Sequence, residues 1–209
     1  VFKGCTEEES AQIKKLTFTK NSGGESYSVT FCDTEISGAL NIPAIYNGKP
    51  VTEIGAEAFA TCTELTSVII PESVTTIGEN AFAYCETLSS IVIPESVTTI
   101  GDKAFSNCTK LETVTIGKSV TTIGEGTFAY CNNLSSVIIP NSVTTIGSEA
   151  FYGCVSLESV IMSKNVTTIS HYAFANCTSL KKIEACENIS DIFSFAFFNC
   201  ESLTDIVLG

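Results

Sequence analysis

Hydrophobic residues recur every 23 positions along most of this chain. Seven phenylalanines keep this spacing without a gap, and a cysteine and then a leucine follow each of them at intervals of three residues. The three columns are Phe59, Phe82, Phe105, Phe128, Phe151, Phe174 and Phe197; Cys62, Cys85, Cys108, Cys131, Cys154, Cys177 and Cys200; and Leu65, Leu88, Leu111, Leu134, Leu157, Leu180 and Leu203. A fixed period in the low twenties predicts a solenoid, in which each repeat forms one coil stacked on the preceding coil.

Each repeat divides into two short strands and a turn region. In the repeat 65–87 the first apolar residues have the spacing L-x-x-L-x-L, and Pro71 ends this strand because proline cannot donate to a ladder. Residues 74–77 are all β-branched and predict a second short parallel strand. Residues 79–85 are too few for a stable helix and predict one or two helical turns. The inward positions are then Leu65, Val68, Ile70, Val74, Ile77, Ala81, Phe82 and Cys85.

Residues 1–38 lack the repeat and are interpreted as a cap for its open end. The spacing T-x-x-E in residues 6–9 is that of a capping box and predicts a short helix. Segments 16–18 and 27–31 alternate apolar and polar residues around a glycine-containing turn, which predicts a β-hairpin. A cap is needed because the first coil would otherwise expose its core and a strand edge. We therefore predict a helix-and-hairpin cap followed by a solenoid of the leucine-rich-repeat type over 39–209, with stacked parallel strands and short helical turns.

The overall charge argues against two classes of partner. The chain has 11 basic and 23 acidic residues, which give a formal net charge of −12. An acidic surface repels the phosphate backbone of nucleic acids, so we predict no nucleic-acid partner. No run of 18 apolar residues is present, so we predict no insertion into a membrane.

Seven of the ten cysteines belong to the repeat. Parallel strands lie about 4.8 Å apart, and Cβ atoms one coil apart would have the same separation, which exceeds the roughly 3.8 Å of a disulfide. We therefore interpret this column as buried free thiols. The other three cysteines are Cys5, Cys32 and Cys186, and we hypothesise that Cys5 and Cys32 form a disulfide in the cap. Ten free thiols in the unreduced, denatured protein would disprove that pairing.

The sequence offers no catalytic constellation. His171 is the single histidine and occupies the same column as Glu79, a surface position. No cysteine pair has C-x-x-C spacing, so we predict no catalytic residue, no metal site and no cofactor. Glu72 and Glu95 lie one coil apart and could bind a cation, but a solvated face that keeps the protein soluble is the favoured interpretation.

The repeat unit L-x-x-[VI]-x-I-P-x-S-V-T-x-I-G-x-x-A-F-x-x-C resembles the BspA-like leucine-rich repeat, a bacterial-type variant. The resemblance covers roughly 39–209, and the segment 39–55 is similar to the entry motif of that family. It implies a secreted or surface-attached bacterial protein, since members are associated with adhesion to host matrix or to other cells. It supplies no binding residues, because the motif residues are structural.

Outward positions of the first strands form the candidate binding surface. They make an apolar stripe with a row of small hydroxyl residues beside it: Ile69, Val92, Thr115, Ile138 and Ile161, flanked by Ser90, Thr113, Ser136 and Ser159. Contiguous exposed apolar residues mark interaction sites, although β-branched residues also satisfy strand propensity. We predict a non-catalytic adhesion or interaction module that binds a protein, such as a host extracellular-matrix or other cell-surface protein, through the concave strand face.

Two other functions remain open at this point. A structural spacer within a larger surface protein would have no partner of its own, and we would then expect further repeats beyond Gly209. The chain stops just after the predicted strand 206–208, so we expect more chain or another covering at that open edge. A carbohydrate-binding module is the weaker alternative, and its sugar-stacking residues would be Tyr84, Tyr130 and Tyr152.

Overall fold

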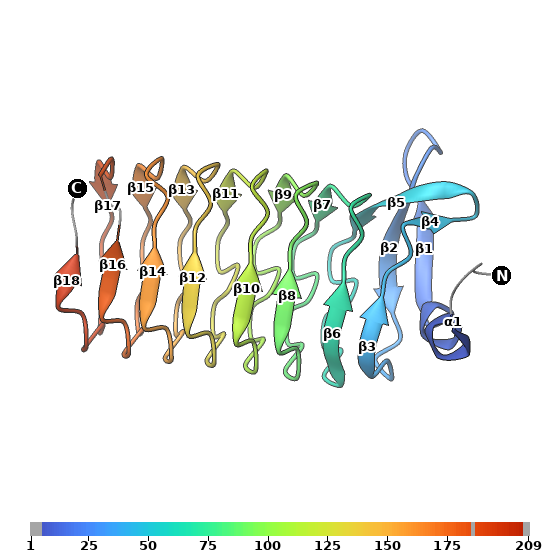
Figure 1. The fold of residues 1–209 in the computed structure, drawn as a ribbon, viewed down its shortest axis with the longest axis horizontal. Helices are drawn as coiled ribbons and strands as arrows, with labels where there is room; N and C mark the ends of the chain where they lie inside the picture. Colours follow the sequence, from blue (N-terminus) through green and yellow to red (C-terminus); the bar gives the residue numbers. More distant parts are fainter. Residues whose placement is uncertain (1–5, 185–186, 207–209) are drawn as a thin grey trace.

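The computed structural model describes residues 6–184 and 187–206 of the chain. Figure 1 shows a solenoid whose coils follow one another along a single long axis, with the cap at its N-terminal end. The predicted fold of stacked parallel strands is confirmed.

The cap consists of one helix and one hairpin. Helix α1 (Glu7–Ile13) begins with a capping box, in which Glu9 N–H donates to Thr6 Oγ1 at 3.1 Å and Thr6 N–H donates to Glu9 Oε2 at 2.8 Å. Strands β1 (Leu16–Lys20) and β2 (Tyr27–Cys32) pair antiparallel as the predicted hairpin. Because β2 also pairs in parallel with β5 (Lys49–Ile54), the cap continues the sheet of the first coil.

Each coil contributes one strand to each of two parallel series. The first-strand series is β3 (Gly38–Asn41), β6 (Leu65–Ile69), β8 (Ser90–Val92), β10 (Thr113–Thr115), β12 (Ser136–Ile138), β14 (Ser159–Ile161), β16 (Lys182–Glu184) and β18 (Asp205–Ile206). The second-strand series begins with β5, against which β4 (Ile45–Tyr46) pairs antiparallel. It continues with β7 (Thr76–Ile77), β9 (Thr99–Ile100), β11 (Thr122–Ile123), β13 (Thr145–Ile146), β15 (Thr168–Ile169) and β17 (Asp191–Ile192). Residues 207–209, where the last strand was expected to end, lie outside the described residues.

The turn regions differ from the sequence prediction, because they contain no helical turn. Residues 79–85 form a succession of turns, with Asn80 and Tyr84 at φ values of 52° and 62°. Positive φ values interrupt a right-handed helix. Alternate backbone N–H groups donate to the next coil, for example from Phe82 to Ala104 O at 2.7 Å, and those between them close turns within the coil, for example from Ala83 to Asn80 O at 3.0 Å. Hydrogen bonds between coils and within single turns therefore take the place of a helix.

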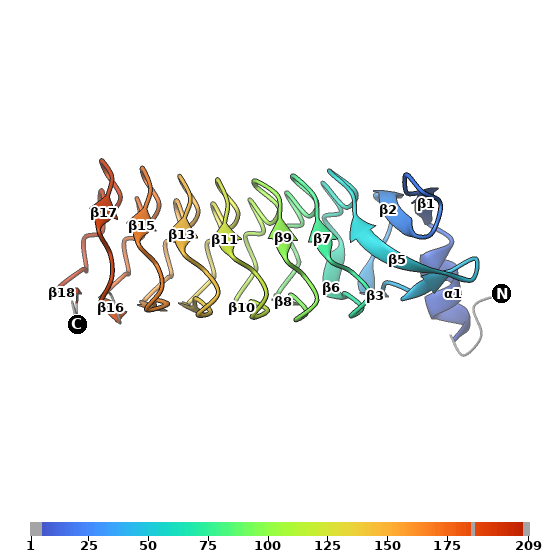
Figure 2. The same cartoon turned by 90° about the horizontal axis from the view of Figure 1, so that it is seen from above.

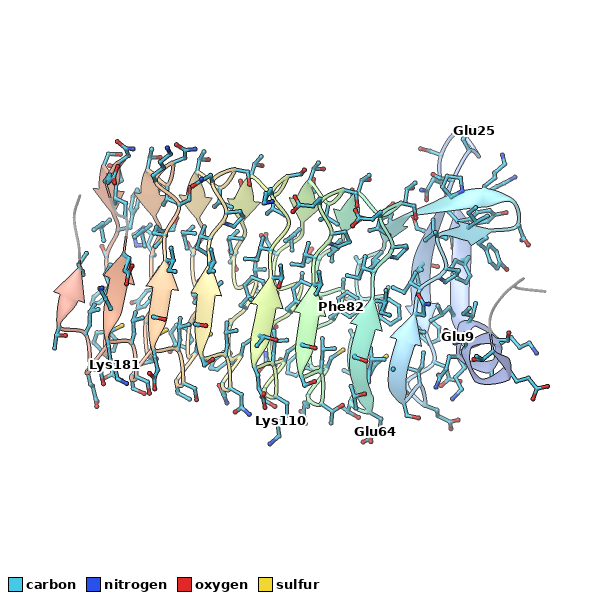
Figure 3. The ribbon with its side chains drawn as sticks, in the orientation of Figure 1. Glu9, Glu25, Glu64, Phe82, Lys110 and Lys181 are labelled. Carbon is cyan, nitrogen blue, oxygen red and sulfur yellow. The ribbon has the colours of Figure 1, made fainter. Side chains whose placement is uncertain are left out.

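The inward positions make one continuous core. All eight predicted for the repeat 65–87 are buried. The phenylalanine rings stack face to face from coil to coil, with centroids 4.9 Å apart at Phe59 and Phe82 and 5.5 Å apart at Phe105 and Phe128. Figure 3 shows Phe82 inside its coil and the charged side chains of Glu64, Lys110 and Lys181 along one outer edge.

Six of the seven cysteines of the column are buried beside this stack, as predicted, and Cys200 is half-buried. The thiol Sγ of Cys85 donates to Phe59 O at 3.2 Å, and Cys131 Sγ makes the equivalent bond to Phe105 O at 3.3 Å. Cysteine therefore combines a small apolar volume with a weak donor for a carbonyl of the preceding coil. Cys5 and Cys186 lie outside the described residues, so the proposed disulfide of Cys5 stays untested. Cys32 is buried, and its Sγ donates to Asp33 O at 3.3 Å.

Candidate binding face on the first strands

The first strands lie side by side on one long face of the solenoid (Figure 1). The strand stripe, defined as Ile69, Val92, Thr115, Ile138 and Ile161, points outward from it. The four aliphatic side chains are 63%, 61%, 64% and 44% exposed in that order, and Thr115 is exposed as well. Strand register sets Val92 beside Thr115 and Ile138 beside Ile161. The apolar row predicted from the sequence is therefore present on the surface.

The flanking hydroxyl row runs parallel to the strand stripe. Register pairs Ser90 with Thr113 and Ser136 with Ser159. The first three of these side chains are exposed and Ser159 is half-buried. Both rows are uncharged, which distinguishes this face from the acidic remainder of the molecule. The structure thus brings all nine predicted residues together, and their role in binding stays a prediction.

The strand face is nearly flat, whereas the resemblance to other solenoids predicted a concave one. Figure 2 shows coils that stand almost parallel to one another along a nearly straight axis. Curvature in a solenoid follows from a rotation between successive repeats. Here the turn regions on the other side are also joined coil to coil by backbone hydrogen bonds, as are the strands. Both sides of the array therefore rise by similar amounts per coil, which leaves little curvature.

A discontinuity interrupts this face at its centre. Strand β10 pairs with β8, and β12 pairs with β14, but no ladder joins β10 to β12 within the described residues. The second-strand series is interrupted one coil earlier, between β9 and β11. The coil 111–133 is consequently bonded to the preceding coil by its first strand and to the following coil by its second strand. In the turn regions the hydrogen bonds continue through it, from Phe105 N to Thr127 O at 2.9 Å and from Phe128 N to Ala150 O at 2.8 Å.

The interruption opens a groove, which we call the β10–β12 groove. It is open to solvent, has a volume of about 690 Å³ and is lined mainly by aliphatic residues, among them Val114, Ile116, Val137, Ile138 and Met162. Val114 is half-buried, whereas its counterparts in neighbouring coils, including Val137, are buried. Sequence reasoning missed this groove. The available signals were Thr115 in the aliphatic stripe and Gly117 in a column that has proline at 71, 94 and 140.

The ends of the strand face differ from its middle. At the C-terminal side the column of the stripe continues as Glu184, whose carboxylate Oε1 lies 2.8 Å from Lys182 Nζ. At the N-terminal side a smaller hollow of about 310 Å³ lies where α1 meets β3, and Gln12, Asn41 and Ile69 line it. The apolar part of the face is therefore bounded by polar residues at both ends.

The buried thiols of the cysteine column have low reactivity. Burial raises the pKa of the Cys108 and Cys154 thiols to about 12, and it raises the pKa of Cys131 well above the usual value. A thiol is nucleophilic only as the thiolate, so these groups are unreactive in the folded protein near neutral pH. Among the described residues, no group of three or more histidine, cysteine, aspartate or glutamate side chains is arranged to hold a metal ion.

The remaining candidates from the sequence are His171, two glutamates and the tyrosines of the turn regions. His171 is exposed, as predicted, and its ring centroid lies 5.0 Å from that of Phe193. Glu95 does not form a cation site with Glu72, because its Oε2 accepts from Lys118 N–H at 2.8 Å and its Oε1 lies 3.6 Å from Lys118 Nζ. Tyr84 and Tyr130 are 49% and 44% exposed on the turn regions.

The repeats of this chain match a known family of leucine-rich repeats. The family model described as "BspA type Leucine rich repeat region" matches residues 27–154 and 103–209, with six copies of the repeat. A comparison with curated proteins finds no significant match. The search for membrane spans, confined to the described residues, finds no helix long and apolar enough to cross a bilayer.

Solved structures of bacterial leucine-rich repeat proteins are similar to this chain. A leucine-rich repeat protein of T. pallidum has a TM-score of 0.88 and 30% identity, with 92% of this chain and 89% of that chain covered. A leucine-rich cell surface protein of Faecalibacterium prausnitzii has a TM-score of 0.83 and 33% identity, with 92% of this chain and 52% of that chain covered. A leucine-rich repeat protein of Eubacterium ventriosum has a TM-score of 0.77 and 30% identity, with 85% and 47% covered. The chain thus spans about half the length of the last two proteins.

Proposed function

The chain belongs to the BspA-type leucine-rich repeat family, and we propose on this premise that it is a non-catalytic interaction module whose strand face binds a protein partner. One observation carries the proposal. Four aliphatic side chains of the strand stripe are between 44% and 64% exposed in a single row. Contiguous apolar surface of this kind is uncommon on a solvated face unless a partner covers it.

The charge distribution supports a protein as the partner. The stripe and the hydroxyl row beside it are uncharged, although the whole chain has a net charge of −12. Depletion of charge around an apolar centre, with polar residues at the rim, is the usual composition of a protein interface. Nucleic acid remains excluded from the proposal, because an acidic surface repels phosphate groups.

We propose a cellular location for the protein as well. The F. prausnitzii protein is described as a cell surface protein. We place the present chain outside the cell or at its surface on this likeness, with host extracellular-matrix or other cell-surface proteins as the partner class. The experiment below tests the partner class directly.

A structural spacer is the second candidate, and the shape of the molecule favours it. Figure 2 shows a nearly straight array, and hydrogen bonds join the coils along its length. Such an array could hold other domains at a distance without binding anything. Carbohydrate binding by Tyr84, Tyr130 and Tyr152 is less well supported, because Tyr152 is half-buried and packs edge-on against Tyr130 with ring centroids 5.3 Å apart.

The test is surface-based binding of the chain to a panel of extracellular-matrix and plasma proteins. The double variant Ile138→Glu/Ile161→Glu places two charges on the stripe. The matched control Thr99→Glu/Thr122→Glu places two charges at exposed positions of the second strands. Circular dichroism verifies that both variants are folded.

We expect saturable binding that the stripe variant loses and the control keeps. Binding retained by a folded stripe variant would move the site to another face. Absence of binding to every member of the panel would favour the spacer.

A further inference from the structure

We propose that the β10–β12 groove receives an extended, uncharged apolar segment of the protein partner. This inference rests on the proposed function and narrows its site from the whole strand stripe to one groove. It is carried by the backbone of the two facing strands, by a buried hydroxyl in the groove, and by the chemistry of the lining.

Backbone groups at the groove lack their ladder partners. In the next coil, Ile139 N–H donates to Ile161 O at 2.9 Å, but among the described residues no equivalent bond joins Ile116 N–H to Ile138 O. Ile116 N–H and Ile138 O are therefore left without this ladder partner at the groove. Strands β10 and β12 lie too close together to admit a further strand between them, but an extended peptide lying over the groove has main-chain donors and acceptors that could bond to these groups. An acyl chain has none along its length.

The side chain of Ser142 supplies an independent indication. Its Oγ is buried, lines the groove and has no hydrogen-bond partner among the described residues. Two serines of the same column in earlier coils have partners, since Ser96 Oγ donates to Val74 O at 2.7 Å and Ser73 Oγ donates to Ala44 O at 3.3 Å. A buried hydroxyl without a partner costs free energy that a bound polar group could recover.

The lining determines what kind of segment would fit. Aliphatic side chains predominate, and the single charged lining residue is Lys118, whose side chain is 83% exposed and paired with Glu95. The Lys118 side chain is therefore largely in solvent, and the other lining residues are uncharged. Its volume of about 690 Å³ lies within the range of small-ligand pockets, which is ample for one or two large apolar side chains. The occupant we infer is an extended segment with apolar anchors and no charged residue at its centre.

The experiment uses the whole chain, immobilised, and a phage-displayed library of random heptapeptides. Thr115→Trp fills the groove from its exposed wall, whereas Ile69→Trp adds the same bulk to the strand stripe outside the groove. Ser142→Ala removes the unpartnered hydroxyl without adding volume. Enriched peptides are titrated against the four proteins by fluorescence anisotropy, with decanoate as a competing acyl chain.

We expect enriched peptides that share an apolar centre, bind the parent and Ile69→Trp proteins equally, and bind Thr115→Trp at least tenfold more weakly. Ser142→Ala should weaken binding several-fold, which keeps the test informative if Thr115→Trp fails to fold. Peptides that bind all four proteins equally would overturn the inference. Saturable binding of decanoate without any enriched peptide would also overturn it, in favour of an acyl ligand.

The two proposals can fail separately. If a matrix or plasma protein binds, and its binding is lost in Ile69→Glu/Val92→Glu but is unaffected by Thr115→Trp, the strand face is an interface and the groove is not its anchor. In that case the proposed function stands and the present inference is wrong.

Discussion

Gly117 lies so close to Pro94 that a Cβ atom on residue 117 would be 2.2 Å from the Pro94 carbonyl oxygen. In the same coil, a Cβ on Gly124 would come no nearer than 3.7 Å to any backbone atom of the three nearest, whereas at Gly101 the corresponding distance is 2.4 Å. The coil 111–133 is therefore tilted. Its first strand is drawn toward the preceding coil and its second strand stands away from it, which places the two ladder interruptions one coil apart.

The close approach at Gly117 predicts that even a methyl group there is destabilising. Gly117→Ala should lower the free energy of unfolding by about 1–3 kcal/mol, because the contacted atoms belong to backbone and cannot rotate away. Pro140→Ala ends with the same residue in the same column, one coil later, and should cost less. Urea denaturation of both variants measures the difference. An equal loss at the two positions would contradict the tilt.

Asp102 bridges the interruption between β9 and β11, since its Oδ1 accepts from Glu125 N–H at 2.9 Å. We predict that Asp102→Ala lowers the free energy of unfolding by about 1 kcal/mol, whereas Asp102→Asn keeps most of the stability because it retains an acceptor. Glu79→Ala is the matched control, since within the described part of the chain the Glu79 carboxylate accepts a hydrogen bond only from the neighbouring Asn80 side chain. Thermal melts of the three variants suffice, and a loss as large in Glu79→Ala as in Asp102→Ala would refute the bridging role.

Phe128 lies at the centre of the ring stack, with neighbouring ring centroids 5.5 Å away at both Phe105 and Phe151. Its side chain is fully buried, so Phe128→Ala should cost about 3–5 kcal/mol. Phe198→Ala removes the same ring from a position that is 55% exposed and should have little effect. Calorimetry gives the comparison, and an unchanged melting temperature for Phe128→Ala would rule out its place in the core.

The buried thiols predict a loss of stability in alkali. An unfolded thiol loses its proton near pH 9, whereas folded Cys108 and Cys154 keep theirs to about pH 12, so unfolding releases protons between these values. Their stabilisation is complete below pH 9 and falls as the pH rises toward 12, by about 1.4 kcal/mol per pH unit for each thiol.

The readout for the thiols is the slope of unfolding free energy against pH, measured by urea denaturation between pH 9 and pH 11. Cys108→Ala/Cys154→Ala should flatten this slope by roughly twice the value for one thiol, whatever its effect on stability at neutral pH. A slope that is identical in the parent and the variant would show that the two thiols titrate alike in the folded and unfolded chain.

The inward and outward positions could be predicted from the sequence because they follow from local alternation and from the 23-residue period. Phe128 and Cys131 are buried and Ile138 is exposed as the repeat pattern indicated. The capping box at Thr6 and the hairpin after it were likewise predictable, since a cap depends on residues that are adjacent in the chain. The candidate face was therefore available from the pattern of one repeat.

The turn regions and the groove were not predictable in this way. Residues 79–85 are too few for a stable helix, and alternate N–H groups among them bond to the next coil, with Asn80 and Tyr84 at positive φ. The β10–β12 groove depends on how far each coil lies from both of its neighbours. The period of the sequence determined which residues each coil buries. Only the stacked structure decided where the ladders break, because the spacing between coils is set by contacts between residues 23 positions apart.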